Sequence, residues 1–247
     1  MELKDKCYEL MEQGKYQEAL ECFDKTLELD PKNVEAGNNK GYCLEMLGRY
    51  QESVESYDKA LELDPKDIVA WNDKGCALSK LGKYHEEIEC YNNVLKLDPN
   101  DVDAPYNKVL ALRKLGKHDE AIDFIIKIAE EWYNKGIALE KLGKYHEAIE
   151  CFDNALELIP NNVYAWDKKG FALGELGMHD EAIECFDTTL ELDPKYVKAW
   201  HNKGIILEKL DRTQEALECY NKALELDHSF EPTIKAKDKL SQSGNDP

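Results

Sequence analysis

Apolar and polar residues alternate along the chain in a pattern that predicts pairs of short helices. In the segment AWNDKGCALSKL, Trp71, Gly75 and Leu78 are spaced i, i+4 and i+7, so they share one helical face. In the next segment, EEIECYNNVLKL, Ile88 and Leu95 share a face in the same way. Two amphipathic helices in close succession predict a helical hairpin.

Each predicted helix ends at a residue that does not favour helix. Gly82 follows the first segment, and glycine is the usual residue just beyond a helix C-terminus. Asp98 and Pro99 follow the second, and proline cannot continue a helix. The pattern therefore alternates glycine turns within hairpins and proline turns between them.

The hairpin pattern repeats every 34 residues. The triplet LDP begins at Leu29, Leu63, Leu97 and Leu192, and LIP begins at Leu158. Seven rows of the repeat begin near residues 1, 34, 68, 102, 129, 163 and 197. This self-similarity predicts an array in which each hairpin packs on its neighbours.

Several columns of the repeat keep one residue type. A leucine column holds Leu10, Leu44, Leu78, Leu112, Leu139, Leu173 and Leu207. A glycine column holds Gly14, Gly48, Gly82, Gly116, Gly143 and Gly177, and an aromatic column holds Phe23, Tyr57, Tyr91, Phe152, Phe186 and Tyr220. In the alanine column, row three has Glu87, for which we expect local strain or a side chain that reaches out to water.

The pattern resembles the tetratricopeptide repeat over about residues 1–230. The matching residues in row three are Trp71, Gly75, Leu78, Gly82, Tyr84, Tyr91 and Pro99. The resemblance implies an all-α fold: a right-handed α-α superhelix, or solenoid, of seven helical hairpins whose first helices line a concave groove for peptides. Residues 231–247 are expected to add a capping helix and a tail. The wording WYNKG…ALEKLGKYHEAIECFDNALEL also resembles repeats common in methanogenic archaea.

Rows four and five follow one another without a turn. Row four begins at Val102 and row five at Ala129, 27 residues later instead of 34, so seven residues are missing. Seven residues make about two helical turns, so the apolar stripe keeps its phase. A continuous helix is predicted over about residues 119–142. The alternative is a tight unwinding near Ala129–Glu131 that keeps an ordinary hairpin.

A fused helix divides the array into residues 1–128, with row four truncated, and residues 129–230. It would also uncover the faces around Phe124, Ile125, Ile128 and Trp132, and uncovered apolar faces usually mark an interface. We therefore expect self-association there, as a swapped two-fold dimer.

The resemblance places candidate binding residues on the first helices. One groove column contains the asparagines Asn39, Asn107, Asn134 and Asn202, which resemble the ladder that holds a peptide backbone in superhelical family members. An amide suits that role because it donates and accepts hydrogen bonds. The alternative is an exposed helix residue copied by repeat duplication. A carboxylate clamp for chaperone tails is not predicted, because Val69 and Asp73 stand at clamp positions.

Aromatic and basic residues extend the candidate groove. The neighbouring columns hold Tyr8, Tyr42, Tyr106, Tyr133, Phe171 and His201, which either anchor a ligand or pack between first helices. Arg113 and Lys141, near helix ends, either make the groove less acidic or complement the helix C-termini.

Composition excludes several classes of partner. The 247 residues include 51 acidic and 32 basic ones, a net charge of −19, which disfavours nucleic acid and anionic membranes as partners. No catalytic motif or metal-ligand spacing occurs, so neither an enzyme nor a cofactor is predicted. Five of the eight cysteines (Cys22, Cys90, Cys151, Cys185 and Cys219) share one repeat slot, which favours packing thiols in a reducing cytoplasm over disulfides.

The sequence therefore predicts a cytoplasmic scaffold or adaptor that binds an extended peptide or protein segment in the concave groove. The alternatives are a self-assembling structural protein and a regulatory array detached from an enzyme.

Overall fold

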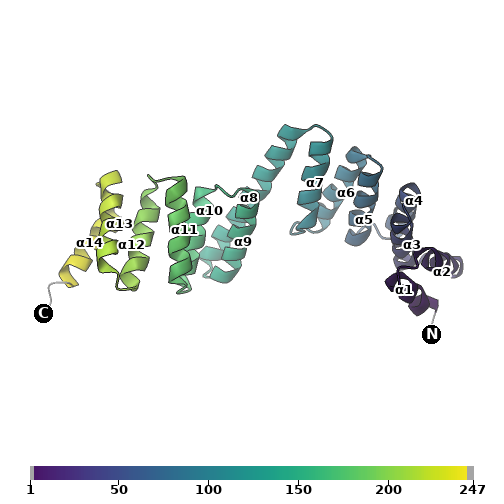
Figure 1. Cartoon of the computed structure of the whole chain (residues 1–247), viewed down its shortest axis with the longest axis horizontal. Helices are drawn as coiled ribbons and strands as arrows, with labels where there is room; N and C mark the ends of the chain where they lie inside the picture. The colour runs from purple at the N-terminus through teal and green to yellow at the C-terminus, as the bar shows by residue number, and fades with distance from the viewer. Residues whose placement is uncertain (1–2, 244–247) are drawn as a thin grey trace. The chain divides into compact units, whose positions relative to one another are not determined.

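The chain folds entirely into helices and turns. A computed structural model describes residues 3–243 and contains fourteen helices and no strand in that range (Figure 1). The all-α arrangement of helical hairpins predicted from the repeat is confirmed. The expected C-terminal tail, residues 244–247, and the first two residues of row one lie outside the described residues.

The helices group into two compact units, residues 1–124 and 125–247. The first unit contains α1 (Leu3–Glu12), α2 (Tyr16–Leu29), α3 (Val34–Met46), α4 (Tyr50–Leu63), α5 (Ile68–Lys80), α6 (Tyr84–Leu97) and α7 (Asp103–Lys114). The second contains α9 (Tyr145–Leu158), α10 (Val163–Glu175), α11 (His179–Leu192), α12 (Val197–Lys209), α13 (Thr213–Leu226) and α14 (Glu231–Ser243). Helix α8 (His118–Lys141) belongs partly to each.

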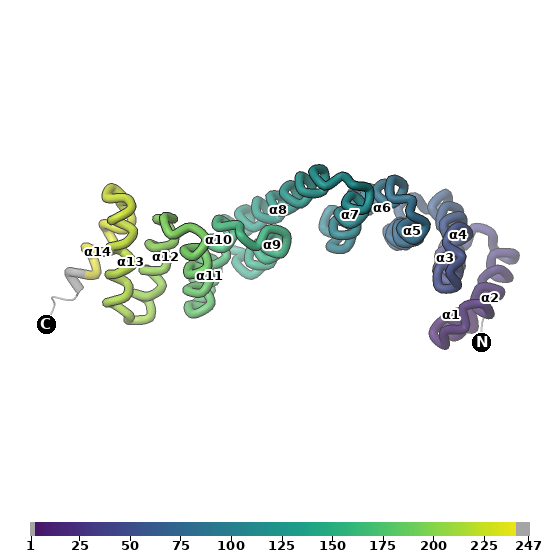
Figure 2. Tube along the Cα trace, turned by 45° about the horizontal axis from the view of Figure 1, so that its top comes forward, coloured from purple at the N-terminus to yellow at the C-terminus, as the bar shows by residue number. Residues whose placement is uncertain are grey.

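Glycine turns close the hairpins. Gly48 has a φ of 74°, a left-handed conformation that costs glycine little, and the Arg49 amide donates to the Leu44 carbonyl at 2.8 Å. Row seven has Asp211 instead of glycine, and this residue still adopts a φ of 58°. Successive helices can therefore pack antiparallel within each unit (Figure 2).

Proline turns join one hairpin to the next, and tryptophan side chains hold three of them. The indole Nε1 atoms of Trp71, Trp166 and Trp200 each donate to the carbonyl of the proline six residues earlier, at 2.8 to 3.0 Å. The side chain of Asp67 caps α5 by accepting from the Ala70 amide at 3.0 Å. These contacts fix the direction in which each new hairpin begins.

The glycine inside the first helix of a hairpin makes room for the aromatic ring of the second. A Cβ atom added at Gly204 would lie 2.4 Å from the Tyr220 ring, closer than any real contact. The first hairpin has Cys7 at this glycine position, where it forms a disulfide with Cys22. The expectation of a packing thiol is therefore wrong for Cys22, whereas Cys90, Cys151, Cys185 and Cys219 are buried free thiols.

Helix α8 runs without a break through the stretch where the proline turn is missing (Figure 2). Phe124, Ile125, Ile128 and Trp132 are half-buried on this helix. Among the large apolar side chains of α8, Ile122 and Ile126 are the exposed ones, with exposed fractions of 52% and 42%.

Glu87 lies inside the core. Only 2% of its surface is exposed, so the expectation that its side chain reaches out to water is wrong. Its Oε2 atom has no hydrogen-bond partner, and burial raises the pKa of the carboxyl above its ordinary value. The other rows have alanine or serine in this column. In the second hairpin, the Ser53 hydroxyl donates to the Gly41 carbonyl of the paired helix at 2.8 Å, so the two helices lie close together there.

None of the helices in the described part of the chain combines the length and the apolar character needed to cross a bilayer.

Candidate functional site

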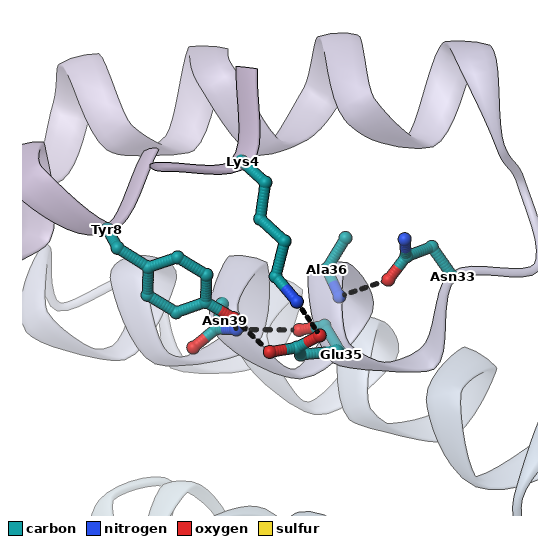
Figure 3. A network of polar contacts seen from close by, with 6 residues as sticks. All are labelled: Lys4, Tyr8, Asn33, Glu35, Ala36 and Asn39. Atoms are coloured by element: carbon teal, nitrogen blue, oxygen red, sulfur yellow. Dashed lines mark hydrogen bonds and ion pairs between the residues drawn. The ribbon is translucent and has the colours of Figure 1, made fainter. Parts of the chain in front are cut away.

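A polar network links α1 and α3 in the first unit (Figure 3). Lys4 Nζ donates to Glu35 Oε2 at 2.6 Å, and the Tyr8 hydroxyl donates to Glu35 Oε1 at 2.5 Å. Asn39 Nδ2 donates both to the Tyr8 hydroxyl at 2.9 Å and to the Glu35 carbonyl at 2.8 Å. Glu35 is thus the centre of the network, and the Oδ1 acceptor of Asn39 is not used in it.

The network shifts the acidity of its members. Burial and the Glu35 carboxylate raise the pKa of Tyr8 to about 12. Hydrogen bonds from Lys4 and Tyr8 lower the pKa of Glu35 below its usual value. The phenol is therefore neutral and the carboxylate charged at neutral pH, so the network contains one cation and one anion.

Aromatic and acidic groups of α3, together with Asp73 of α5, continue the surface. Tyr42, 37% exposed, contacts Tyr16 edge to face with ring centroids 6.2 Å apart. Burial, followed by the charge of Asp73, raises the pKa of Glu45, and burial also raises the pKa of Asp73. The first unit therefore places two carboxyl groups beside the exposed phenol of Tyr42.

The second unit contains a different cluster, built around Asp167. This aspartate is 4% exposed and accepts from Asn202 Nδ2 at 3.1 Å and from the Tyr196 hydroxyl at 3.4 Å. Burial raises its pKa, although the bond from Asn202 opposes the shift. Tyr196 contacts Tyr164 edge to face at 5.8 Å, and Tyr164 is 59% exposed. The cluster is a satisfied polar centre with an exposed phenol at its edge.

Neighbouring first helices of the second unit are linked by an ion pair. Lys168 Nζ lies 2.8 Å from Glu140 Oε1, and the Glu140 side chain is only 12% exposed. The Tyr133 ring packs on Phe152 at 5.9 Å. At the end of the unit, the His201 ring nitrogen lies 3.0 Å from the Thr233 hydroxyl of α14. The last hairpin is therefore joined to the C-terminal helix by a polar contact.

The predicted groove residues differ in how far their polar atoms are already used. Asn39 and Asn202 donate to partners within the protein, whereas Asn107 is half-buried and Asn134 is exposed. Tyr106 is 65% exposed, and Arg113 and Lys141 are also exposed.

Sequence reasoning missed four residues of these clusters: Glu35, Asp167, Tyr164 and Tyr196. Glu35 carried a usable signal, since it precedes Asn39 by one helical turn on the same face. No such signal in the sequence pointed to Asp167, because its column of the repeat varies in residue type from row to row.

No group of three or more metal-ligating side chains occurs among residues 3–243. Burial raises the pKa of the Cys185 and Cys219 thiols to about 11, which makes them poor nucleophiles.

Family models for the tetratricopeptide repeat match residues 6–68, 56–89, 129–162, 163–196 and 197–230. Together these segments cover well over half of the chain. The chain belongs to the tetratricopeptide repeat family. The unmatched stretch between the segments contains the truncated fourth repeat and the start of α8.

Solved structures with a similar arrangement include other tetratricopeptide repeat (TPR) proteins. YrrB, described as having an unusual peptide-binding site, is 23% identical over 87% of this chain and 97% of its own, with a TM-score of 0.40. A TPR protein from Parabacteroides merdae is 20% identical over 97% of each chain, with a TM-score of 0.49. The first TPR domain of Spaghetti (RPAP3), bound to the HSP90 peptide SRMEEVD, is 26% identical over 49% of this chain and 96% of its own, with a TM-score of 0.47. No curated protein matches the sequence.

Proposed function

We propose that this TPR protein is a scaffold that binds an extended peptide or protein segment along the groove faces of its first helices. The observation that carries the proposal is the network of Lys4, Tyr8, Glu35 and Asn39. It joins two consecutive first helices through the exposed charged side chains of Lys4 and Glu35 and through an amide whose oxygen the network does not use. Such a surface matches the alternating donors and acceptors of an extended backbone.

The charge near Tyr42 favours a ligand with basic side chains. Burial raises the pKa of the carboxyl groups of Glu45 and Asp73, and the charge of Asp73 adds to the shift at Glu45. A lysine or arginine of the ligand would relieve that repulsion. The exposed ring of Tyr42 would add a cation–π contact.

A peptide library displayed on phage tests the proposal. We expect selection to enrich extended peptides rich in Lys and Arg. Their affinity should fall about tenfold or more in Asn39→Ala and Tyr42→Ala, because each change removes a groove contact. Glu86→Ala, on an exposed glutamate of α6, is the matched control and should bind as the parent does.

Two results would contradict the groove proposal. One is a selection that enriches no sequence. The other is a set of enriched peptides that binds equally well to the parent and to both groove variants.

A second candidate function is self-association through α8, which is favoured by the exposure of Ile122 and Ile126 on successive turns of that helix. A swapped dimer would bury them. Light scattering of Ile126→Glu and the parent tests this, and a parent that is strictly monomeric at micromolar concentration contradicts it.

Cytoplasmic location, likeness to archaeal repeats and a regulatory role beside an enzyme stay predictions of the sequence.

A further inference from the structure

The second repeat lacks a tryptophan at a position where four other repeats have one, namely Trp71, Trp132, Trp166 and Trp200. No proline turn precedes Trp132, whereas the other three each donate the indole N–H to the carbonyl of the proline six residues earlier. Row two has Gly37 at the same position, and Pro31 precedes it by the same six residues. The second repeat therefore keeps the proline carbonyl that accepts the hydrogen bond but lacks the indole that donates it.

The cation that accompanies the indole is also present in the second repeat. Lys74 Nζ lies 5.2 Å from the centre of the Trp71 ring, and Lys169 Nζ lies 5.4 Å from that of Trp166. Both lysines pair with an aspartate of the preceding hairpin. The equivalent lysine of the second repeat, Lys40, forms the equivalent pair with an Nζ–Oδ1 distance of 2.7 Å to Asp24.

A cavity of about 400 Å³ lies where the missing indole would be. We call it the Gly37 pocket; its walls include Leu27, Pro31, Gly37, Lys40, Leu44 and Ala60. Cavities of about 460 Å³ occur at the same place beside Trp166 and Trp200, but there the indole itself forms a wall. The counterparts of Leu27, Pro31 and Ala60 do not line those cavities. In the second repeat the cavity therefore extends deeper, into the space that the tryptophan side chain fills in those repeats.

Small residues keep the Gly37 pocket open. Ser56 donates to the Gly37 carbonyl at 3.0 Å, which uses its hydroxyl inside the protein. A Cβ atom added at Gly37 would lie 3.4 Å from the Ala60 Cβ, which is an ordinary contact distance. The slot is thus neither collapsed nor filled by a neighbouring side chain.

The Gly37 pocket is separate from the peptide groove. At 3.6 residues per turn, Gly37, Lys40 and Leu44 share one face of α3. The groove residues Glu35, Asn39 and Tyr42 share the opposite face. A ligand in one site therefore leaves the other free.

We propose that the Gly37 pocket binds the indole of a tryptophan side chain supplied by a partner protein. The indole N–H would donate to the Pro31 carbonyl, and the Lys40 ammonium would lie over the ring, as their counterparts do in the third and sixth repeats. An aliphatic side chain offers neither the N–H nor the π face, so the pocket selects an aromatic donor. This inference does not depend on peptide binding in the groove, and it would still hold if the groove proposal were contradicted.

The probe for the pocket is N-acetyl-L-tryptophanamide, titrated into the full isotope-labelled chain and followed by NMR. We expect saturable shifts at the Ser56 and Ala60 amides, with a Kd on the order of 1 mM for so small a ligand. N-acetyl-L-leucinamide should bind about tenfold more weakly. In Gly37→Trp the probe should lose at least about tenfold in affinity, because the protein's own indole fills the slot.

A second pair of variants keeps the test decisive if Gly37→Trp does not fold. Lys40→Met retains the length of the side chain but removes the cation, and should weaken probe binding several-fold. Lys83→Met, at a lysine of the same unit that does not line the pocket, is the matched control and should bind as the parent does. Shifts confined to the Glu35 face, equal binding of both amides, or unchanged binding in Lys40→Met would overturn the proposal.

Discussion

At the residue scale, the third hairpin has a buried carboxylate at a position where the other hairpins have alanine or serine. Glu87 is 2% exposed, and one of its oxygens has no hydrogen-bond partner. Burial of a carboxylate without full hydrogen bonding is costly, so the side chain is held by the surrounding helices against its own preference for water.

Replacing Glu87 with alanine should raise the free energy of unfolding by about 1–2 kcal/mol at neutral pH. Burial raises the pKa of Glu87, so the folded chain binds this proton more tightly than the unfolded chain does. The parent's stability therefore falls as pH rises above the ordinary glutamate pKa, and the advantage of the variant grows over the same range. Urea unfolding at about pH 4.5 and about pH 8 measures both effects.

Glu86→Ala is the control for this prediction, since Glu86 is exposed on the same helix. A Glu87→Ala protein that is no more stable than Glu86→Ala at either pH would contradict the account of the buried charge.

The groove residues show how far single positions can be predicted from the sequence. The column of Asn39 and Asn202 follows from the period alone, because a helical face is fixed by spacing. Their partners on neighbouring helices, Tyr8 and Asp167, depend on how far apart those helices lie. That distance is set by packing and is not encoded in the spacing of any one helix.

At the element scale, the turn between hairpins is held by one hydrogen bond from an indole to a proline carbonyl. Trp166→Phe removes the bond to Pro160, which measures 2.8 Å, and should lower the free energy of unfolding by about 1 kcal/mol beyond the loss of ring size. Trp132→Phe is the matched control, because that tryptophan follows no proline turn. Equal losses in the two variants, measured by chemical unfolding, would show that the bond does not hold the turn.

The first hairpin is fastened by the disulfide between Cys7 and Cys22, 15 residues apart in sequence. Reduction should destabilise α1 and α2 by about 3 kcal/mol, because the unfolded chain regains the freedom of that loop. Hydrogen exchange measures the effect, and the hairpin of α12 and α13, with a free Cys219, is the internal control. Unchanged exchange in α1 after reduction would contradict this prediction.

Helix α8 was readable from the sequence because no helix-breaking residue lies between Asp123 and Asn134, and the apolar phase is kept. The disulfide was not readable in the same way. Cys7 stands in a column of glycines, and only the close approach of paired helices brings it to Cys22, with a Cα–Cα distance of 5.4 Å.

At the scale of the whole molecule, the net charge of −19 opposes folding through mutual repulsion. Salt screens that repulsion, so the melting temperature should rise by a few degrees between about 20 mM and about 300 mM sodium chloride. Differential scanning fluorimetry measures it. A melting temperature that falls with salt would mean that specific ion pairs outweigh the net charge.

The acidic surface also bears on the proposed ligand. A basic segment should associate quickly with this chain and bind less tightly as salt increases. Family membership follows from the repeat period, whereas the ligand depends on side chains that differ from one repeat to the next.

The most direct test of groove binding is to map a phage-selected peptide on the full chain by NMR. Bound peptide should shift the signals of Tyr8, Glu35, Asn39 and Tyr42, and these shifts should shrink in Asn39→Ala. Shifts confined to the second helices of the hairpins, around Glu55 of α4 and Glu86 of α6, with the signals of the first helices unmoved, would contradict the account.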